Sequence, residues 1–203
     1  MAHTDAPIAT ATFEEYMEME YTSETRHEFI NGEIIPMPYT SPEHGTIVLN
    51  LGSLLHGCFL KKNAQVWLND RMVYVAGIGC DHAFYPDAVI VDGEPEYLDY
   101  RGKMKATKNP SVLVEVLSDS TEDIDRHEKW QCYQTLPSLK KYILISQKRM
   151  AVEVFERING SGKWTYMTLR EPESAVKMLA CKIKLNDLYA KIIFPTPAPR
   201  SGD

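Results

Sequence analysis

The sequence is poor in the patterns that assign a protein to a class at once. Its four cysteines are scattered and none forms a Cys-x-x-Cys pair, so the spacing of a zinc ribbon is absent. We therefore expect reduced thiols and a cytoplasmic protein. The chain also shows no internal repeat. The cysteines are Cys58, Cys80, Cys132 and Cys181.

Long apolar runs are missing as well. No segment is long enough to cross a bilayer, and no signal peptide precedes the first expected helix, so we expect no membrane partner. Hydrophobic content of 44% and charged content of 25% are ordinary for a globular protein. We expect a flexible leader over residues 1–11, one domain over 12–193 and a disordered, proline-containing tail over 194–203.

Positive charge is scarce, because 22 lysines and arginines face 28 acids and the formal net charge is −6. This balance argues against a protein that binds nucleic acid over its whole surface, although a local basic groove can coexist with it. The densest positive run lies between Tyr97 and Pro110. It is either a solvated loop or an edge that contacts phosphates. Its cations are Arg101, Lys103, Lys105 and Lys108.

Local signals predict alternating strands and helices. Thr12 and Glu15 fit a capping box at the start of a short helix, and Asn31-Gly32 between apolar-rich runs predicts a hairpin. A helix is expected from Pro42 to about Leu60, followed by a strand from Gln65 to Val75 around a polar bend. Further strands are expected near residues 141–146, 151–157 and 163–169, the last two as a hairpin.

Two apolar, β-branched segments each carry one carboxylate. Asp87 follows Pro86 and opens the first segment, and Glu115 lies inside the run Val-Leu-Val-Glu-Val-Leu. An acid in such a run is costly unless a metal, a proton or a cation satisfies it. Glu28, next to apolar residues on the predicted hairpin strand, is a third acid of this kind. We therefore expect Asp87 and Glu115 to converge on a divalent cation.

The helix expected after Glu115 places a lysine on the same face as an acid. Asp125, Lys129, Tyr133 and Leu136 recur at helical spacing and share one stripe. Two ionised carboxylates about 4 Å apart repel by roughly 4 kcal/mol at an effective dielectric constant of about 20. Oxygen-only ligation suits magnesium or manganese better than zinc. A lysine nearby would stabilise negative charge that develops on a phosphoryl group.

Each of these residues also has a plain structural interpretation. Asp87 after proline can cap a turn, and Glu115 can pair with a buried arginine or lysine. Lys129 on a helix can face solvent, and Tyr133 can serve packing alone. His44, in the first turn of its helix, either contacts a phosphate or carboxylate or takes a capping or surface role.

Pro86-Asp87, followed 28 positions later by Glu115 in an apolar strand, resembles the PD-(D/E)xK nuclease superfamily. More closely, the chain is similar to the Uma-type restriction endonuclease family. The similarity covers roughly Thr12 to Tyr189. It is carried by Thr12-Phe13-Glu14-Glu15-Tyr16, Arg26-His27-Glu28-Phe29-Ile30-Asn31-Gly32-Glu33, Tyr85-Pro86-Asp87, Val114-Glu115-Val116-Leu117-Ser118, Lys129 with Tyr133, and Lys141-Tyr142-Ile143-Leu144-Ile145.

The resemblance implies an α/β (α+β) restriction-endonuclease-like core, with a mixed central β-sheet flanked by helices. It implies metal binding by Asp87 and Glu115 with the main-chain carbonyl of Val116, and it matches Glu28 to an early acid of the superfamily core. The superfamily lysine normally stands two residues after the second acid, where this chain has Leu117. In the Uma-type pattern Lys129 takes that place.

The function expected from these residues is hydrolysis of nucleic-acid phosphodiester bonds by a Mg²⁺-dependent endodeoxyribonuclease, with Mn²⁺ as a substitute. Its catalytic residues would be Glu28, Asp87, Glu115 and Lys129, its substrate DNA and its assembly a homodimer. The alternative is a catalytically silent nucleic-acid-binding or protein-interaction module with the same fold. A phosphodiesterase acting on a small nucleotide would use the same residues.

Overall fold

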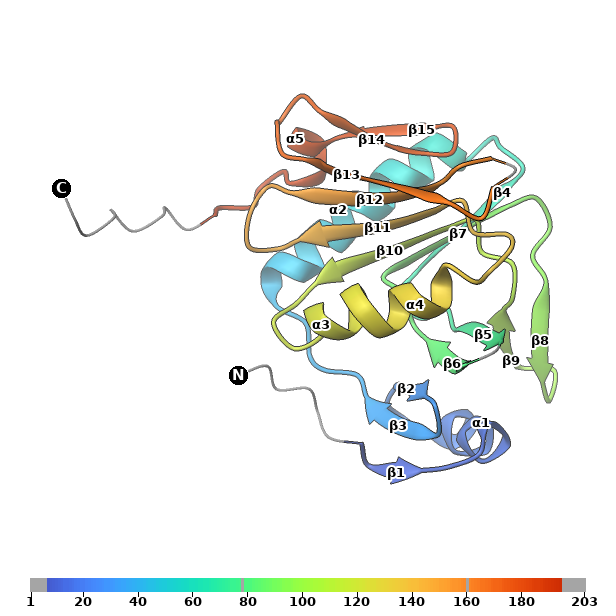
Figure 1. Ribbon diagram of the computed structural model, residues 1–203. Coiled ribbons are helices and arrows are strands. Elements are labelled where there is room, and N and C mark those ends of the chain that lie inside the picture. The colour runs from blue at the N-terminus through green and yellow to red at the C-terminus, as the bar shows by residue number, and fades with distance from the viewer. Residues whose placement is uncertain (1–6, 78, 160, 195–203) are drawn as a thin grey trace.

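The computed structural model describes residues 7–77, 79–159 and 161–194, and its centre is a six-stranded mixed sheet (Figure 1). Only β10 and β11 run parallel to each other, and the other neighbours are antiparallel. In sheet order the strands are β13 (Trp164–Leu169), β12 (Val152–Arg157), β11 (Lys141–Ser146), β10 (Val112–Leu117), β7 (Ala88–Asp92) and β4 (Ala64–Leu68).

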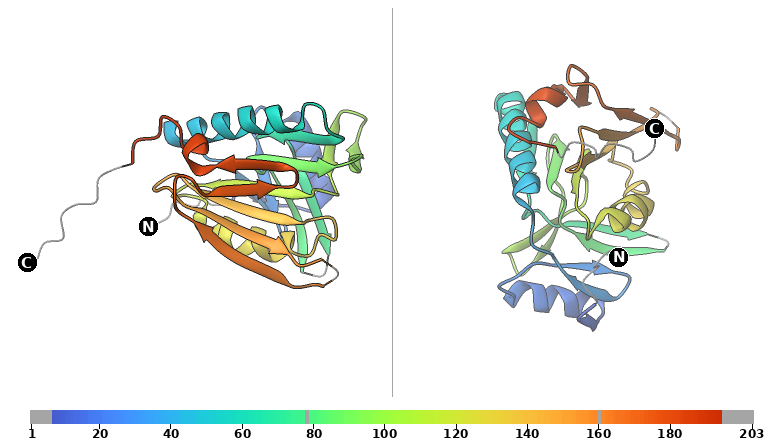
Figure 2. Two further views of the ribbon diagram at one scale, coloured as in Figure 1. Left: turned by 90° about the horizontal axis from the view of Figure 1, so that it is seen from above. Right: turned by 90° about the vertical axis from the view of Figure 1, so that its left-hand side faces the viewer.

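Helices cover both faces of this sheet, which is why its inner strands are apolar on both faces (Figure 2). Val112, Val114 and Val116 of β10 pack with α2, whereas Leu113 and Leu117 pack with α4. The covering elements are α2 (Pro42–Phe59), α5 (Leu185–Leu188) and the hairpin of β14 (Ala175–Met178) and β15 (Cys181–Lys184) on one side. On the other side lie α3 (Glu122–Ile124), the π-helical turn η1 (Asp125–Lys129) and α4 (Trp130–Tyr133).

A second, seven-stranded sheet lies below the first in Figure 1 and packs against α1 (Phe13–Thr22). The capping box of Thr12 and Glu15 is present at the start of that helix. Asn31 and Gly32 take φ values of 47° and 90°, as a tight hairpin turn requires. In sheet order the strands are β1 (Ala9–Thr10), β3 (Glu33–Pro36), β2 (His27–Ile30), β6 (Cys80–Phe84), β5 (Val73–Gly77), β9 (Met104–Thr107) and β8 (Tyr97–Tyr100).

The structure confirms the restriction-endonuclease-like mixed sheet flanked by helices, but several local predictions are wrong. The strand expected from Gln65 to Val75 is two strands, β4 and β5, which belong to different sheets. The basic run after Tyr97 forms the β8–β9 hairpin, and β6 and β14 have no counterpart among the expected strands. These strands carry charged or polar residues, so their pairing depends on neighbours distant in sequence.

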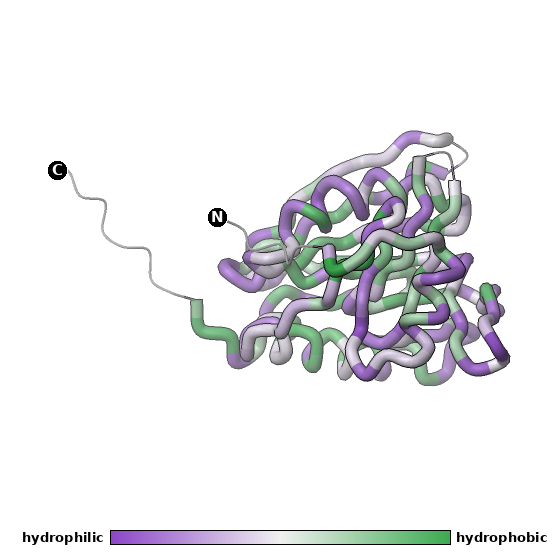
Figure 3. Tube along the Cα trace, turned by 90° about the horizontal axis from the view of Figure 1, so that it is seen from below, coloured by the Kyte–Doolittle hydropathy of each residue, from purple (hydrophilic) through white to green (hydrophobic). Residues whose placement is uncertain are grey.

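Residues near both ends of the described chain contact the rest of the fold. Within the expected leader, Ala9 and Thr10 form β1 and pair with β3. Phe194, the first residue of the expected tail, packs its ring against Tyr189 at 5.4 Å, while residues 1–6 and 195–203 lie outside the described residues. Polar and apolar positions interleave along the trace (Figure 3). None of the described helices is long and apolar enough to span a membrane.

The cysteines depart from expectation, because the structure joins them in two disulfides. Cys58 on α2 pairs with Cys181 on β15, and Cys80 on β6 pairs with Cys132 on α4. The prediction of reduced thiols is therefore wrong in this structure. The scattered spacing concealed the pairing, since the partners are separated by 123 and 52 residues along the chain.

Reduction should destabilise the protein. Each bridge closes a long loop in the unfolded chain, so its loss should lower the free energy of unfolding by about 2–5 kcal/mol. The measurement is urea denaturation with and without dithiothreitol, with the pairs Cys58→Ala/Cys181→Ala and Cys80→Ala/Cys132→Ala tested separately. Alkylation of four thiols in denaturant before any reduction would contradict the pairing.

Candidate active site

The site lies where the two sheets meet, and four elements bring side chains to it. On β10, Glu115 occupies the register position between Leu113 and Leu117, on the face covered by η1 and α4. Asp87 immediately precedes β7, the antiparallel neighbour of β10. Glu28 comes from β2 of the second sheet, and Lys129 ends the π-helical turn. Such turns occur frequently at functional sites in helices.

Lys129 is the centre of the site. Its ammonium nitrogen lies 2.9 Å from Glu28 Oε1, 2.9 Å from Asp125 Oδ1 and 3.2 Å from Glu115 Oε1. The side chain is only 5% exposed, so these ion pairs are shielded from water. Tyr133 adds a long hydroxyl contact of 3.4 Å to Glu115 Oε1. One cation therefore stands among three buried carboxylates.

The excess of acid changes how these groups titrate. Burial raises the pKa of the Glu115 carboxyl well above its usual value, and the neighbouring acids Asp125 and Asp87 add to the rise while Lys129 opposes it. Burial likewise raises the pKa values of Glu28 and Asp125. Burial alone would lower the pKa of Lys129, but the surrounding carboxylates outweigh it and raise that pKa. The lysine is therefore a fixed positive charge at neutral pH.

Asp87 is held by two donors rather than by the lysine. Its Oδ2 accepts the main-chain N–H of Val116 at 2.7 Å, and its Oδ1 lies 2.9 Å from His44 Nε2. His44 stands in the first turn of α2, where its own N–H bonds to the Ser41 N-cap hydroxyl. The imidazole is buried, and its Nδ1 has no hydrogen-bond partner within the described residues. The structure thus selects a contact with a carboxylate from the alternatives for His44.

These groups share one small pocket of about 60 Å³. The loop after β3 forms part of its wall, and Tyr39 in that loop is fully exposed. Its lining residues are Glu28, Met37, Pro38, Tyr39, Thr40, His44, Tyr85, Asp87, Glu115, Val116, Ser118, Thr121, Asp125 and Lys129. We call this cavity the site pocket.

The site pocket suits a hard cation. Asp87, Glu115 and Val116 line one cavity in which acids outnumber the lysine. Mg²⁺ is commonly held by one or two carboxylates, with water and substrate phosphate as its other ligands. Among the residues the structure describes, no set of three or more His, Cys, Asp or Glu side chains forms a preassembled metal cage. The carboxylates of Asp87 and Glu115 therefore fit an ion whose remaining ligands would come from water and a substrate.

The structure brings together all the residues named from the sequence. Glu28, Asp87, Glu115 and Lys129 line the same pocket as Val116, and the interpretation of Lys129 as solvent-facing is wrong. The ion-pair interpretation of Glu115 also holds, with Lys129 as partner, and Tyr133 contacts Glu115 besides packing.

Sequence reasoning gave no role to Asp125, although its i, i+4 spacing to Lys129 was visible in the helical stripe. Asp125 Oδ2 also accepts a hydrogen bond from Thr121 at 2.9 Å. His44 was considered, but nothing in the sequence linked it to Asp87, 43 residues away.

The fold and the site define a protein of the restriction-endonuclease-like class. A family model described as "Uma2: Putative restriction endonuclease" matches residues 13–185. The chain belongs to this family, as the order of its motifs predicted.

The chain is also similar to two proteins of Synechocystis sp. and to one solved structure. The "Uncharacterized protein sll1609" of Synechocystis sp. is 31% identical over 172 residues, which are 85% of this chain and 94% of that protein. A second Synechocystis protein, slr1290, is 25% identical over 196 residues, 96% of this chain and all of the relative. A crystal structure from Anabaena variabilis, titled "a putative nuclease belonging to DUF820", matches with a TM-score of 0.70 at 18% identity, covering 92% of this chain and 100% of that one. At that identity the structural match shows the fold alone.

The raised carboxyl pKa values predict that the metal-free protein loses stability as the pH rises. Groups whose pKa is higher in the folded than in the unfolded chain stabilise the fold fully below the unfolded value, and that stabilisation disappears as the pH passes the folded pKa. Urea denaturation in EDTA at several pH values above about 5 should therefore show a falling free energy of unfolding. Glu115→Gln should flatten this fall, because glutamine does not titrate.

The exposed Glu33, on β3, provides the matched control, and Glu33→Gln should keep the wild-type slope. Burial lowers the pKa of His82 to about 4, so the contribution of His82 to the stability increases as the pH rises, opposite to that of the carboxyl groups. That contribution is common to all three proteins and cancels in the comparison. Identical slopes for Glu115→Gln and wild type would show that Glu115 does not titrate as the structure indicates.

Proposed function

We propose that the protein is a Mg²⁺-dependent endodeoxyribonuclease, with Mn²⁺ as a substitute, that hydrolyses phosphodiester bonds in DNA. The observation that carries the proposal is the convergence of Asp87, Glu115, Glu28 and Lys129 in one pocket of a chain that belongs to a restriction endonuclease family. Asp87, Glu115 and the Val116 carbonyl would hold the ion. The bound ion would polarise a phosphoryl oxygen and lower the pKa of a water molecule.

The chain's own residues then have distinct tasks. The Val116 N–H and His44 fix the Asp87 carboxylate, so that its oxygens keep one orientation. Lys129 supplies positive charge beside the phosphoryl group, where negative charge grows as water attacks phosphorus and the bond to the sugar oxygen breaks. Its raised pKa makes it an electrostatic stabiliser rather than a base. Glu28 and Asp125 hold its ammonium group in place.

The alternative of a silent module has one observation in its favour. Lys129 is already surrounded by three carboxylates, which is also the arrangement of a purely structural ion network. Such a network needs no metal, so metal binding separates the two functions. A homodimer, which would supply two sites for two strands, stays a prediction.

Cleavage is tested with plasmid DNA and Mg²⁺. Asp87→Ala, Glu115→Ala and Lys129→Ala should each lower the rate by about a hundred-fold or more, because each removes a charge from the reacting centre. Glu33→Gln and Lys184→Ala, which change exposed residues on β3 and β15, should cleave like wild type. Equal cleavage by all six proteins would identify a contaminating nuclease and leave this protein inactive.

Metal binding should be visible without any substrate. At a concentration a hundred times the dissociation constant, a ligand of the folded state adds about 2.7 kcal/mol to its stability. Mg²⁺ or Mn²⁺ should therefore raise the melting temperature of the wild-type protein, and Asp87→Asn and Glu115→Gln should abolish the rise. Sodium chloride at matched ionic strength is the control. A silent module predicts no rise in any of the proteins.

A further inference from the structure

A second cavity, much larger than the site pocket, lies beside it. Its volume is about 570 Å³, and three segments form its walls: the end of α1 with the residues after it, the connection between β4 and β5, and the β8–β9 hairpin. Its charged lining consists of Arg26, Arg71, Lys103, Lys105, Glu20 and Asp70. We call this cavity the basic groove.

The basic groove is positive in a chain whose net charge is −6. Four cations face two carboxylates, and one of these is already engaged, because Glu20 accepts the Tyr85 hydroxyl at 2.8 Å and lies 3.0 Å from His27 Nδ1. Asp70 lies 3.8 Å from Arg26. Arg26 also lies 3.9 Å from Glu20, so it is paired with both carboxylates, and Arg71, Lys103 and Lys105 supply the remaining positive charge of the groove. Of these three, only Lys105 forms an ion pair within the described residues, with Asp99 at 3.6 Å.

Among the four cations, Arg71 is held in place by Thr107 and two aromatic rings. Its Nε donates to Thr107 Oγ1 at 2.7 Å, and its guanidinium lies over the rings of Trp67 and Tyr97 at 5.2 and 4.6 Å. Nη2 is buried without a hydrogen-bond partner, and no carboxylate pairs with this arginine in the part of the chain that the structure describes. Burial lowers the pKa of Arg71. Arg71 is half-buried, and an anion in the groove would offset its charge and give Nη2 a hydrogen-bond partner.

The basic groove and the site pocket share a wall. Tyr85 lines both cavities; its hydroxyl bonds to Glu20 on the groove side, and its N–H bonds to Glu28 Oε1 at 3.3 Å on the site side. Asp87 follows two residues later in the chain. An anion in the groove is therefore adjacent to the proposed reacting centre.

The acids of the site pocket make such a groove necessary. Glu28, Asp87, Glu115 and Asp125 repel a polyanion, and only Lys129 and a bound cation oppose them. Affinity for a nucleic-acid backbone comes chiefly from lysines and arginines that neutralise phosphates. A strand must therefore find its positive contacts outside the site pocket, and the groove next to it offers Arg71, Lys103 and Lys105.

We propose that the basic groove binds backbone phosphates of the DNA strand next to the bond that is cut. The inference rests on the proposed function, since it takes DNA as the substrate. The phosphate group is the chemistry recognised, and Lys103 and Lys105 on the β8–β9 hairpin contact it directly. Arg71 acts through its charge, held in place by Trp67, Tyr97 and Thr107.

The test measures binding of a fluorescent DNA duplex to the full-length chain in EDTA, by anisotropy over a series of salt concentrations. The double variant Lys103→Gln/Lys105→Gln should bind about ten-fold more weakly, and the slope of log affinity against log salt should fall by roughly 1.8, because two phosphate contacts are lost. Both lysines are exposed, so the melting temperature should not change.

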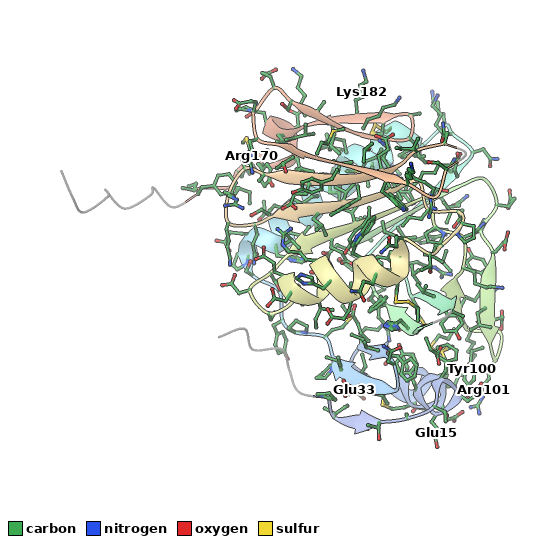
Figure 4. All side chains as sticks on the ribbon, viewed as in Figure 1. Glu15, Glu33, Tyr100, Arg101, Arg170 and Lys182 are labelled. Carbon is green, nitrogen blue, oxygen red and sulfur yellow. A yellow bond between two sulfur atoms is a disulfide. The ribbon has the colours of Figure 1, made fainter. Side chains whose placement is uncertain are left out.

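A charge-matched control is available at the opposite end of the molecule. Arg170 and Lys182 are exposed, and Figure 4 shows both far from Arg101, which lies at the turn of the β8–β9 hairpin. Arg170→Gln/Lys182→Gln should keep the wild-type affinity and salt slope. Equal weakening by the control and the groove variant overturns the proposal, because the effect would then be one of net charge.

Inorganic phosphate distinguishes a strand from a single free anion. At constant ionic strength, millimolar phosphate should leave DNA binding unchanged, because one anion cannot replace several backbone contacts. Displacement of the duplex by phosphate at that concentration overturns the proposal of a strand site. The groove would then be a site for small phosphates.

Kinetics separates this proposal from the proposed function. With plasmid and Mg²⁺, the groove variant should raise KM about ten-fold with kcat unchanged, since it removes binding and not chemistry. Cleavage by a groove variant with unchanged KM and affinity overturns the groove proposal alone. Groove-dependent DNA binding by a wild-type protein that cleaves with neither Mg²⁺ nor Mn²⁺ supports the groove and contradicts the proposed function.

Discussion

The ammonium group of Lys129 forms ion pairs with carboxylates from both sheets at the place where the sheets meet. Its three carboxylate partners come from β2 of the second sheet, β10 of the central sheet and the turn of helix that carries the lysine itself. Removing a single partner from such a buried network leaves charge without compensation, which is strongly destabilising. Because the acids exceed the cation, the network is complete only when a proton or another cation joins it.

This imbalance bears on the proposed function, in which an acidic chain acts on nucleic acid. The site pocket is lined by acids, which would attract a metal cation. The basic groove on the other side of Tyr85 is lined by lysines and arginines, which would attract the phosphates of a DNA backbone. In our proposals the site pocket would hold the metal and the basic groove would hold the phosphates. Net charge alone reports the sum of the two and conceals both.

Much of the architecture could be predicted because it depends on neighbours in sequence. The capping box at Thr12, the Asn31-Gly32 turn, the helix from Pro42 and the strand around Glu115 are all present as expected. Strand β6 and the β8–β9 hairpin were not predicted, because their charged or polar sequences form strands only when a partner strand lies alongside. Both disulfides were also missed, because each joins cysteines that are far apart in the sequence.

The sequence by itself determined that Glu115 would be buried in an apolar strand, that Asp87 would stand at the start of another, and that a helical lysine would share a face with Asp125. Periodicity fixes which residues face the same side of one element, and the motif order places the chain in its family. Only the tertiary structure decided that Glu28 would also hold Lys129, that His44 would meet Asp87, and that Arg71 would have no carboxylate partner among the described residues. The contacts of Glu28 with Lys129 and of His44 with Asp87 join elements far apart in the chain, and no local pattern encodes them.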